Sequence, residues 1–166
     1  MQETPEQYKS RILKLMEGKD AVAVQRETAA KLAKLVEGAS GDQLARRPAP
    51  DKWSVSEILV HLAEAEVSCF WRYRQMIEHN GSTIIPFDQD LWYKLGEYGS
   101  RDPQESLQLF RLMRDANLRM FDQLAPEQWQ RGGVHTERGP MTVADLARQM
   151  AGHDINHVAQ VQTLLG

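Results

Sequence analysis

The chain has 166 residues, of which 42% are hydrophobic and 26% are charged. This length suits one domain with a single core, and the composition excludes a disordered or fibrous chain. The chain carries 20 Lys and Arg residues and 23 Asp and Glu residues, which gives a net charge of −3. Such a balance argues against nucleic acid or an anionic membrane as the main partner. We therefore expect a single domain over residues 1–166.

The sequence also bears on the cellular compartment. The single cysteine, Cys69, excludes an internal disulfide, and the first seven residues lack the basic and apolar regions of a signal peptide. No apolar run approaches the roughly 20 residues that span a bilayer. We expect a soluble, cytoplasmic protein.

Apolar residues recur every three or four positions along most of the chain, which predicts helices. The first helix is expected over residues 5–17, and the second over residues 20–37 with Asp20 as its N-cap. Residues 38–53 are expected to form a connection, because two prolines in this segment interrupt any helix.

A longer helix is expected to follow this connection. Ser54 and Glu57 match a capping box at its start, and its apolar positions continue over residues 54–79. Residues 80–101 are the least regular part of the chain and are expected to hold only a short helix, over residues 88–95.

The last two helices are expected over residues 103–124 and 143–165. Thr142 and Asp145 resemble a second capping box, and a glycine-rich loop lies between these helices. No segment shows the alternating pattern of a β-strand at useful length. The pattern therefore predicts an all-α fold, a four-helix bundle with an extra short N-terminal helix in an extension over residues 1–18.

Three of the five histidines are candidate metal ligands. His153 and His157 stand four residues apart on the last helix, so their imidazoles share one face and can share one ion. On a helical wheel they lie about 80° and 40° from the centre of the apolar stripe, and both point toward the bundle interior or its mouth. His61 flanks the apolar stripe of the helix over residues 54–79. Together they predict a three-histidine site for a divalent ion, Zn or Ni, with one position left for water.

The sequence leaves less specific interpretations open for these residues. A histidine at the edge of an apolar face is more often a hydrogen-bonded core residue than a ligand, and spacing alone does not decide between the two. His79 is expected at the surface beside a helix C-terminus, and His135 is expected to be structural. Cys69 is expected to be buried and inert.

Carboxylates inside apolar stripes need partners. Glu66 and Asp154 lie in such stripes, and Arg114 lies on the inward stripe of the helix over residues 103–124. We therefore expect Glu66 to pair with Arg114. Glu64 and Asp154 are candidate catalytic residues that would relay a proton, with a purely structural role as the alternative for both.

Several blocks of residues occur in a characteristic order: Trp53-Ser54-Val55, Ile58 to Glu66, Arg114 with Asn117 and Leu118, His135 with Gly139 and Thr142, and His153 to Gln160. With this order, the chain resembles the DinB-like superfamily of four-helix metal-binding proteins, which includes the YfiT-type hydrolases, over about residues 20–166. The resemblance implies a metal site at His61, His153 and His157, and a homodimer. The family often has Asp where this chain has Glu64, which leaves the role of this carboxylate open.

Two functions remain as hypotheses. The first is a metal-dependent enzyme, a hydrolase or, by resemblance, a transferase of a low-molecular-weight thiol. In it the ion would lower the pKa of a bound water or thiol that attacks a small-molecule substrate. The alternative is a non-catalytic, dimeric, stress-associated binding or scaffold protein in which the ion is structural or absent.

Overall fold

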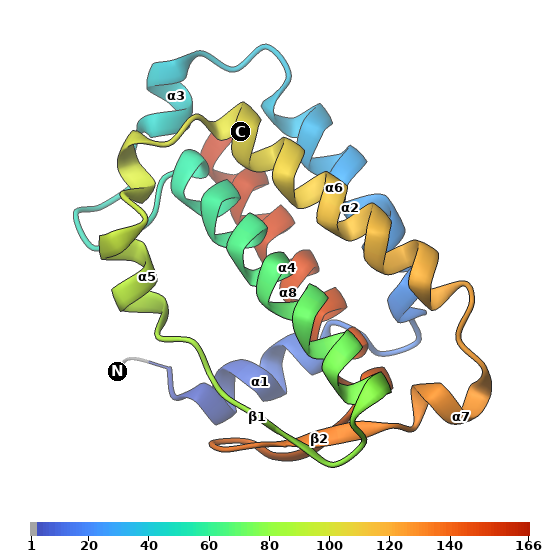
Figure 1. Cartoon of the computed structure of the whole chain (residues 1–166). Helices are drawn as coiled ribbons and strands as arrows, with labels where there is room; N and C mark the ends of the chain where they lie inside the picture. Colours follow the sequence, from blue (N-terminus) through green and yellow to red (C-terminus); the bar gives the residue numbers. More distant parts are fainter. Residues whose placement is uncertain (1–2) are drawn as a thin grey trace.

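Four long helices form the body of the protein. The structure, a computed structural model, describes residues 3–166. The long helices run side by side as a bundle (Figure 1): α2 (Ala21–Val36), α4 (Val55–Glu78), α6 (Pro103–Phe121) and α8 (Val143–Leu165). Both α4 and α2 contact α6 on one side and α8 on the other. The predicted four-helix bundle is confirmed. Within the described residues, no helix is both long and apolar enough to cross a membrane.

Local capping signals explain where the long helices begin. The Ser54 hydroxyl accepts from the Glu57 backbone N–H, and the Glu57 carboxylate accepts from the Ser54 N–H at 2.8 Å. Thr142 and Asp145 form the same reciprocal pair at the start of α8. The Asp20 side chain caps α2. Each cap satisfies backbone donors that the first helical turn leaves unpaired, and all three were predicted.

The connections contain short helices: α3 (Gly41–Ala45), α5 (Gln89–Leu95), the 3₁₀ turn η1 (Tyr98–Ser100) and α7 (Pro126–Trp129). Of these, only α5 was predicted. The others have at most five residues, which is too short for a helical period to emerge. The N-terminal helix, α1 (Pro5–Lys14), lies across one end of the bundle and packs against α8 (Figure 1).

A small sheet corrects the expectation that the chain forms no β-structure. β1 (Ser82–Ile84) pairs in parallel with β2 (Gly132–His135), which pairs antiparallel with β3 (Gly139–Thr142). At Gly133 a Cβ would lie 2.5 Å from the Ser82 carbonyl oxygen, so only glycine permits this approach. The sheet joins two loops about fifty residues apart and lies at the same end of the bundle as α1 (Figure 1).

Charged side chains lie at the centre of the bundle. Arg114 on α6 donates to Glu66 on α4 at 2.8 Å, to Asp154 on α8 at 3.1 Å and to the carbonyl oxygen of Gln25 on α2 at 3.1 Å. Each of the three charged side chains is 1% exposed. Asn117 donates to the second Glu66 oxygen at 2.7 Å. The predicted pairing of Glu66 with Arg114 is confirmed, and one guanidinium links all four long helices.

Helix α1 packs closely against α8 at Gly152, a residue without a side chain. A Cβ on Gly152 would lie 2.3 Å from the carbonyl oxygen of Ile12 and 2.8 Å from its carbonyl carbon. Gly152→Ala is therefore expected to displace α1 and to lower the free energy of unfolding by about 1–3 kcal/mol. Hydrogen exchange followed by mass spectrometry should show faster exchange over residues 5–16.

The matched control for this substitution is Gly41→Ala, because an added Cβ at Gly41 meets no atom within 4 Å. This control should leave hydrogen exchange over residues 5–16 unchanged. Equal exchange in Gly152→Ala and in the wild type would show that the close contact between α1 and α8 does not hold α1 in place.

Candidate metal centre

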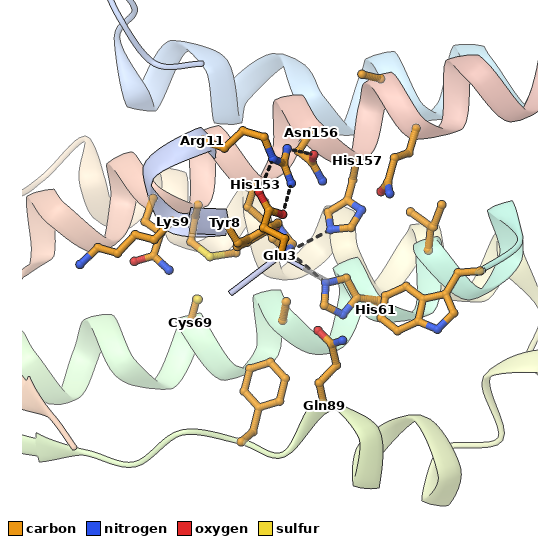
Figure 2. Close-up of a pocket in the computed structure, with 18 of the residues that line it drawn as sticks. Glu3, Tyr8, Lys9, Arg11, His61, Cys69, Gln89, His153, Asn156 and His157 are labelled. Atoms are coloured by element: carbon orange, nitrogen blue, oxygen red, sulfur yellow. Dashed lines mark hydrogen bonds and ion pairs between the residues drawn. The ribbon is translucent and has the colours of Figure 1, made fainter. Parts of the chain in front are cut away.

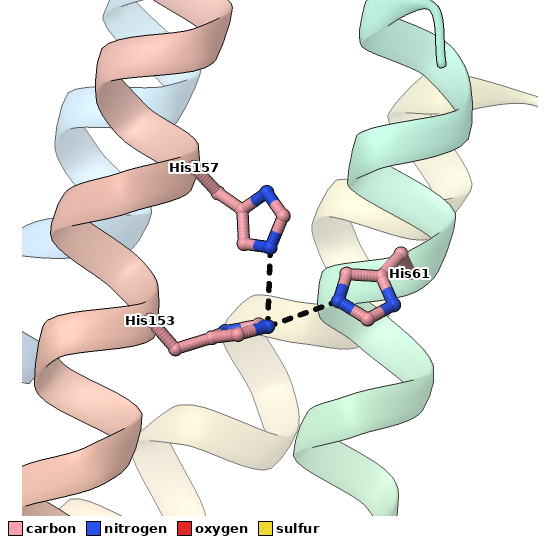
Figure 3. Close-up of side chains that lie close together, drawn as sticks. All are labelled: His61, His153 and His157. Carbon is pink, nitrogen blue, oxygen red and sulfur yellow. Dashed lines mark hydrogen bonds between the residues drawn. The ribbon is translucent and has the colours of Figure 1, made fainter. Parts of the chain in front are cut away.

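Three imidazoles converge between α4 and α8. Nε2 of His153 lies 2.9 Å from Nε2 of His61 and 3.1 Å from Nε2 of His157 (Figure 3). All three residues are buried: His61 is 4% exposed, His153 is 9% exposed and His157 is 6% exposed. The predicted convergence of these three residues from two helices is confirmed.

The helices set the positions of these rings. His153 and His157 lie one turn apart on α8, so their rings project to the same side, toward α4 (Figure 3). His61 meets them from α4, and its ring packs against the Trp53 indole with the centroids 4.9 Å apart. Trp53 directly precedes Ser54, the first residue of the capping box of α4. The cap that starts this helix therefore also positions the indole that packs against His61.

Burial keeps the three rings neutral. It lowers the pKa of His61 and of His153 well below the ordinary value of 6.5, and His157 acts in the same direction on both. Burial also lowers the pKa of His157, to about 4, although Gln160 opposes the change. Neutral imidazole is the form that binds a metal ion. The ligands are therefore ready to bind at neutral pH without losing protons.

The donor set fits a divalent cation. A neutral imidazole carries one proton, and the Nδ1 atom of each ring is buried without a hydrogen-bond partner among the described residues. With the protons on Nδ1, three Nε2 lone pairs face one another, and a cation among them satisfies all three. If His153 carried its proton on Nε2 instead, this atom would donate a hydrogen bond to only one of the two neighbouring Nε2 atoms, those of His61 and His157. Three nitrogen donors suit a borderline ion such as Zn²⁺ or Ni²⁺.

The histidines lie in the wall of a cavity of about 950 Å³ (Figure 2). Helix α1 contributes one side of this cavity, and α4 and α8 contribute the others. The wall includes these apolar or sulfur-containing residues: Trp53, Ile58, Ala65, Cys69, Leu146 and Met150. A small molecule with an apolar body can therefore reach the three Nε2 atoms.

The structure places the two candidate proton-relay residues away from this cavity. Glu64 accepts from the Tyr98 hydroxyl at 2.5 Å and from Arg101 at 2.9 Å. Asp154 follows His153 in the chain, but its carboxylate contacts Arg114. Neither carboxylate is among the described residues that line the cavity. Their role in proton transfer stays a prediction, whereas these contacts give both a structural role.

His79 and Cys69 lie where the sequence suggested, whereas His135 lies in a strand instead of a loop. His79 is exposed at the end of α4, and His135 is buried in β2. Cys69 is 2% exposed, and burial raises the pKa of its thiol to about 12, so the thiol is protonated at neutral pH. His135 also lines the cavity, which its position in a glycine-rich loop did not indicate.

The lowered histidine pKa values predict a pH dependence for the metal-free protein. In the unfolded chain these rings take up protons below about pH 6.5, whereas the folded protein resists protonation until lower pH. The contribution of these rings to the free energy of unfolding is therefore expected to be complete above pH 6.5 and to be lost as the pH drops toward 4. Urea unfolding in the presence of EDTA measures this dependence.

The exposed His79 gives the control for this pH dependence. His79→Gln should keep the wild-type curve, whereas His153→Gln should make it less steep between pH 6.5 and 4, because only two of the three buried rings then remain. A wild-type curve that is already flat in this range would contradict the neutral, buried state of the rings.

Comparison with known proteins agrees with the sequence motifs. Residues 26–161 match the model of the DinB superfamily. The Bacillus subtilis protein named "Putative metal-dependent hydrolase YfiT" is 26% identical over 160 residues, which cover 95% of this chain and 90% of YfiT. A Geobacillus kaustophilus protein, GK0616, named as the same kind of hydrolase, is 26% identical over 145 residues, or 86% of this chain and 81% of GK0616.

Solved structures show the same fold. That of YfiT has a TM-score of 0.81 at 23% identity and covers 97% of this chain and 87% of YfiT. The mycothiol-dependent maleylpyruvate isomerase has a TM-score of 0.65 at 8% identity, over 88% of this chain and 59% of the isomerase. The family match spans most of the chain and includes the three converging histidines. The chain therefore belongs to the DinB superfamily.

Proposed function

We propose that this protein is a metal-dependent hydrolase in which His61, His153 and His157 hold one divalent ion, Zn²⁺ or Ni²⁺. The observation that carries the proposal is the convergence of three buried, neutral Nε2 atoms in the wall of a cavity large enough for a small molecule. The names of the relatives in Bacillus and Geobacillus support the same activity.

The chain's own residues prepare the site for this chemistry. When bound, a divalent ion with three histidine ligands supplies a water of lowered pKa as the nucleophile. Three neutral imidazoles add no negative charge, so the cationic character of the site is preserved. Trp53 packs against the ring of His61 and restricts its orientation, and α1 contributes part of the cavity wall. The apolar wall binds the body of the substrate.

Removal and return of the ion test the proposal. EDTA-treated protein is expected to lose hydrolysis of 4-nitrophenyl acetate and to regain it with one equivalent of Zn²⁺ or Ni²⁺. Mg²⁺ is the control, because it prefers oxygen ligands and should restore nothing. Failure to take up Zn²⁺ or Ni²⁺ would overturn the site. Uptake without hydrolysis, together with a steep fall in melting temperature on chelation, would favour a structural ion instead.

Thiol transfer is a second candidate activity. The shared fold of a mycothiol-dependent isomerase supports it, as does a cavity with room for a thiol beside the histidines. Metal-loaded protein is then expected to accelerate the reaction of glutathione with 1-chloro-2,4-dinitrobenzene, in which the thiolate displaces chloride. Equal rates with loaded and EDTA-treated protein would eliminate this candidate.

A further inference from the structure

The cavity extends far beyond the histidine cluster. His61, Ala65, Cys69 and Arg72 follow one face of α4, and all four line the cavity. His61 and Arg72 are eleven residues apart, which corresponds to about 16 Å along the helix axis. Figure 2 shows Cys69 and Lys9 on the side of the cavity away from His61. A molecule that contacts both ends of this cavity is therefore elongated.

The far end of the cavity carries three cations from three separate parts of the chain. Lys9 lies on α1, Arg72 on α4, and Arg138 in the turn between β2 and β3. Arg72 is held in place, since its Nη2 donates to the Ile85 carbonyl oxygen at 2.8 Å and its guanidinium lies 5.6 Å from the centroid of the Phe87 ring.

His135 adds a neutral donor to this end. Its Nδ1 accepts from the backbone N–H of Glu137 at 3.3 Å, so the ring proton is on Nε2, which becomes the donor. Burial lowers the pKa of His135, and Arg138, Arg72 and Lys9 lower it further. His135 is thus influenced by all three cations, Arg138 most strongly, whereas Glu137 acts in the opposite direction.

Acidic residues of the cavity compensate this charge only in part. Glu3 pairs with Arg11 at 2.9 Å, and Asp51 pairs with Lys52 at 3.2 Å. Glu137 is the remaining acidic residue of the described wall, and its carboxylate forms no ion pair there. Three cations thus face one carboxylate at the end that carries His135.

We propose that Lys9, Arg72, Arg138 and His135 form a binding site for an anionic oxygen group, a carboxylate or a phosphate, at one end of an elongated substrate. Guanidinium and ammonium groups in a partly enclosed site bind such groups through charge-assisted hydrogen bonds. The apolar wall then holds the body of the molecule, and its reacting bond lies at the histidines. This last placement rests on the proposed function, whereas the anion site itself forms without a metal ion.

Three probes of similar size test the anion site in EDTA-treated protein by isothermal titration calorimetry. They are 4-phenylbutyrate, 2-phenylethyl phosphate and the neutral 4-phenylbutyramide. At low ionic strength at least one anion is expected to bind about tenfold more tightly than the amide, and added salt should reduce this preference. The tighter of the two anions identifies the group that the site prefers.

The double substitution Lys9→Gln and Arg138→Gln removes two cations and leaves the Arg72 contacts in place. It is expected to reduce the preference for the anion to about twofold or less. Arg119→Gln, an exposed change on α6 away from the cavity, is the matched control and should keep the wild-type preference.

Equal affinity for anion and amide, no binding of any probe, or an unchanged preference in the double variant would overturn the anion site. Metal uptake measured on the same samples separates the two proposals. Uptake of the ion without an anion preference refutes only the anion site, and an anion preference without uptake refutes only the metal centre.

Discussion

His157→Ala is expected to purify without a stoichiometric divalent ion, whereas the proposed three-histidine centre predicts one such ion in the wild-type protein. The substitution removes one of three nitrogen donors from a buried site, and two donors on different helices remain. Loss of a group that merely orients a ligand costs about 10- to 100-fold in metal affinity, so loss of a ligand itself should cost more. Elemental analysis, followed by titration with Zn²⁺ against a chromophoric chelator, measures the effect.

His79→Ala is the control for this loss, because the His79 side chain is 68% exposed at the end of α4. The control should retain the ion at wild-type stoichiometry. Circular dichroism of both variants shows whether the bundle is intact. Wild-type affinity in a folded His157→Ala protein would refute the three-histidine centre.

Arg114→Ala is expected to cause the largest loss of stability of any single substitution considered. It would leave Glu66 and Asp154, each 1% exposed, without the cation that compensates them. Breaking a buried ion pair from one side costs about 3–5 kcal/mol. Urea unfolding should therefore show a free energy of unfolding lower by this amount.

Arg111→Ala, one turn earlier on α6, is the matched control. Its guanidinium lies 3.9 Å from Asp115 and the side chain is 73% exposed, so its loss should cost less than about 0.5 kcal/mol. Replacing Arg114, Glu66 and Asp154 together by apolar residues should recover much of the stability, since no buried charge then remains. Similar stability of Arg114→Ala and Arg111→Ala would show that the buried network contributes little.

The long helices and the histidine cluster could be predicted because their signals are local. Each of the two capping boxes is a four-residue signal that marks the start of a helix. The spacing of apolar residues over about the next twenty positions then shows which face of the helix is buried. His153 and His157 lie on one face whatever the tertiary structure, and the apolar stripe gives the direction of that face. The pairing of Glu66 with Arg114 followed from the need to compensate buried charges.

The small sheet and the cluster of cations at the far end of the cavity could not be predicted, because both depend on contacts between distant segments of the chain. β1 and β2 have three and four residues, and the reason for their pairing, the close approach at Gly133, exists only in the folded protein. Lys9, Arg72 and Arg138 share no motif or period in the sequence. The additional pairing of Arg114 with Asp154 was missed because one guanidinium contacts both carboxylates.

Helix α1 and the three histidines come from different parts of the chain but line the same cavity. The match to the family model covers residues 26–161, and α1 precedes it and supplies Tyr8 and Lys9 to the wall of the cavity. The histidine ligands all lie inside that region. Substitutions in α1 can thus change the shape and charge of the cavity without changing any of the three histidines, so the cavity wall and the histidine cluster can vary independently among related proteins.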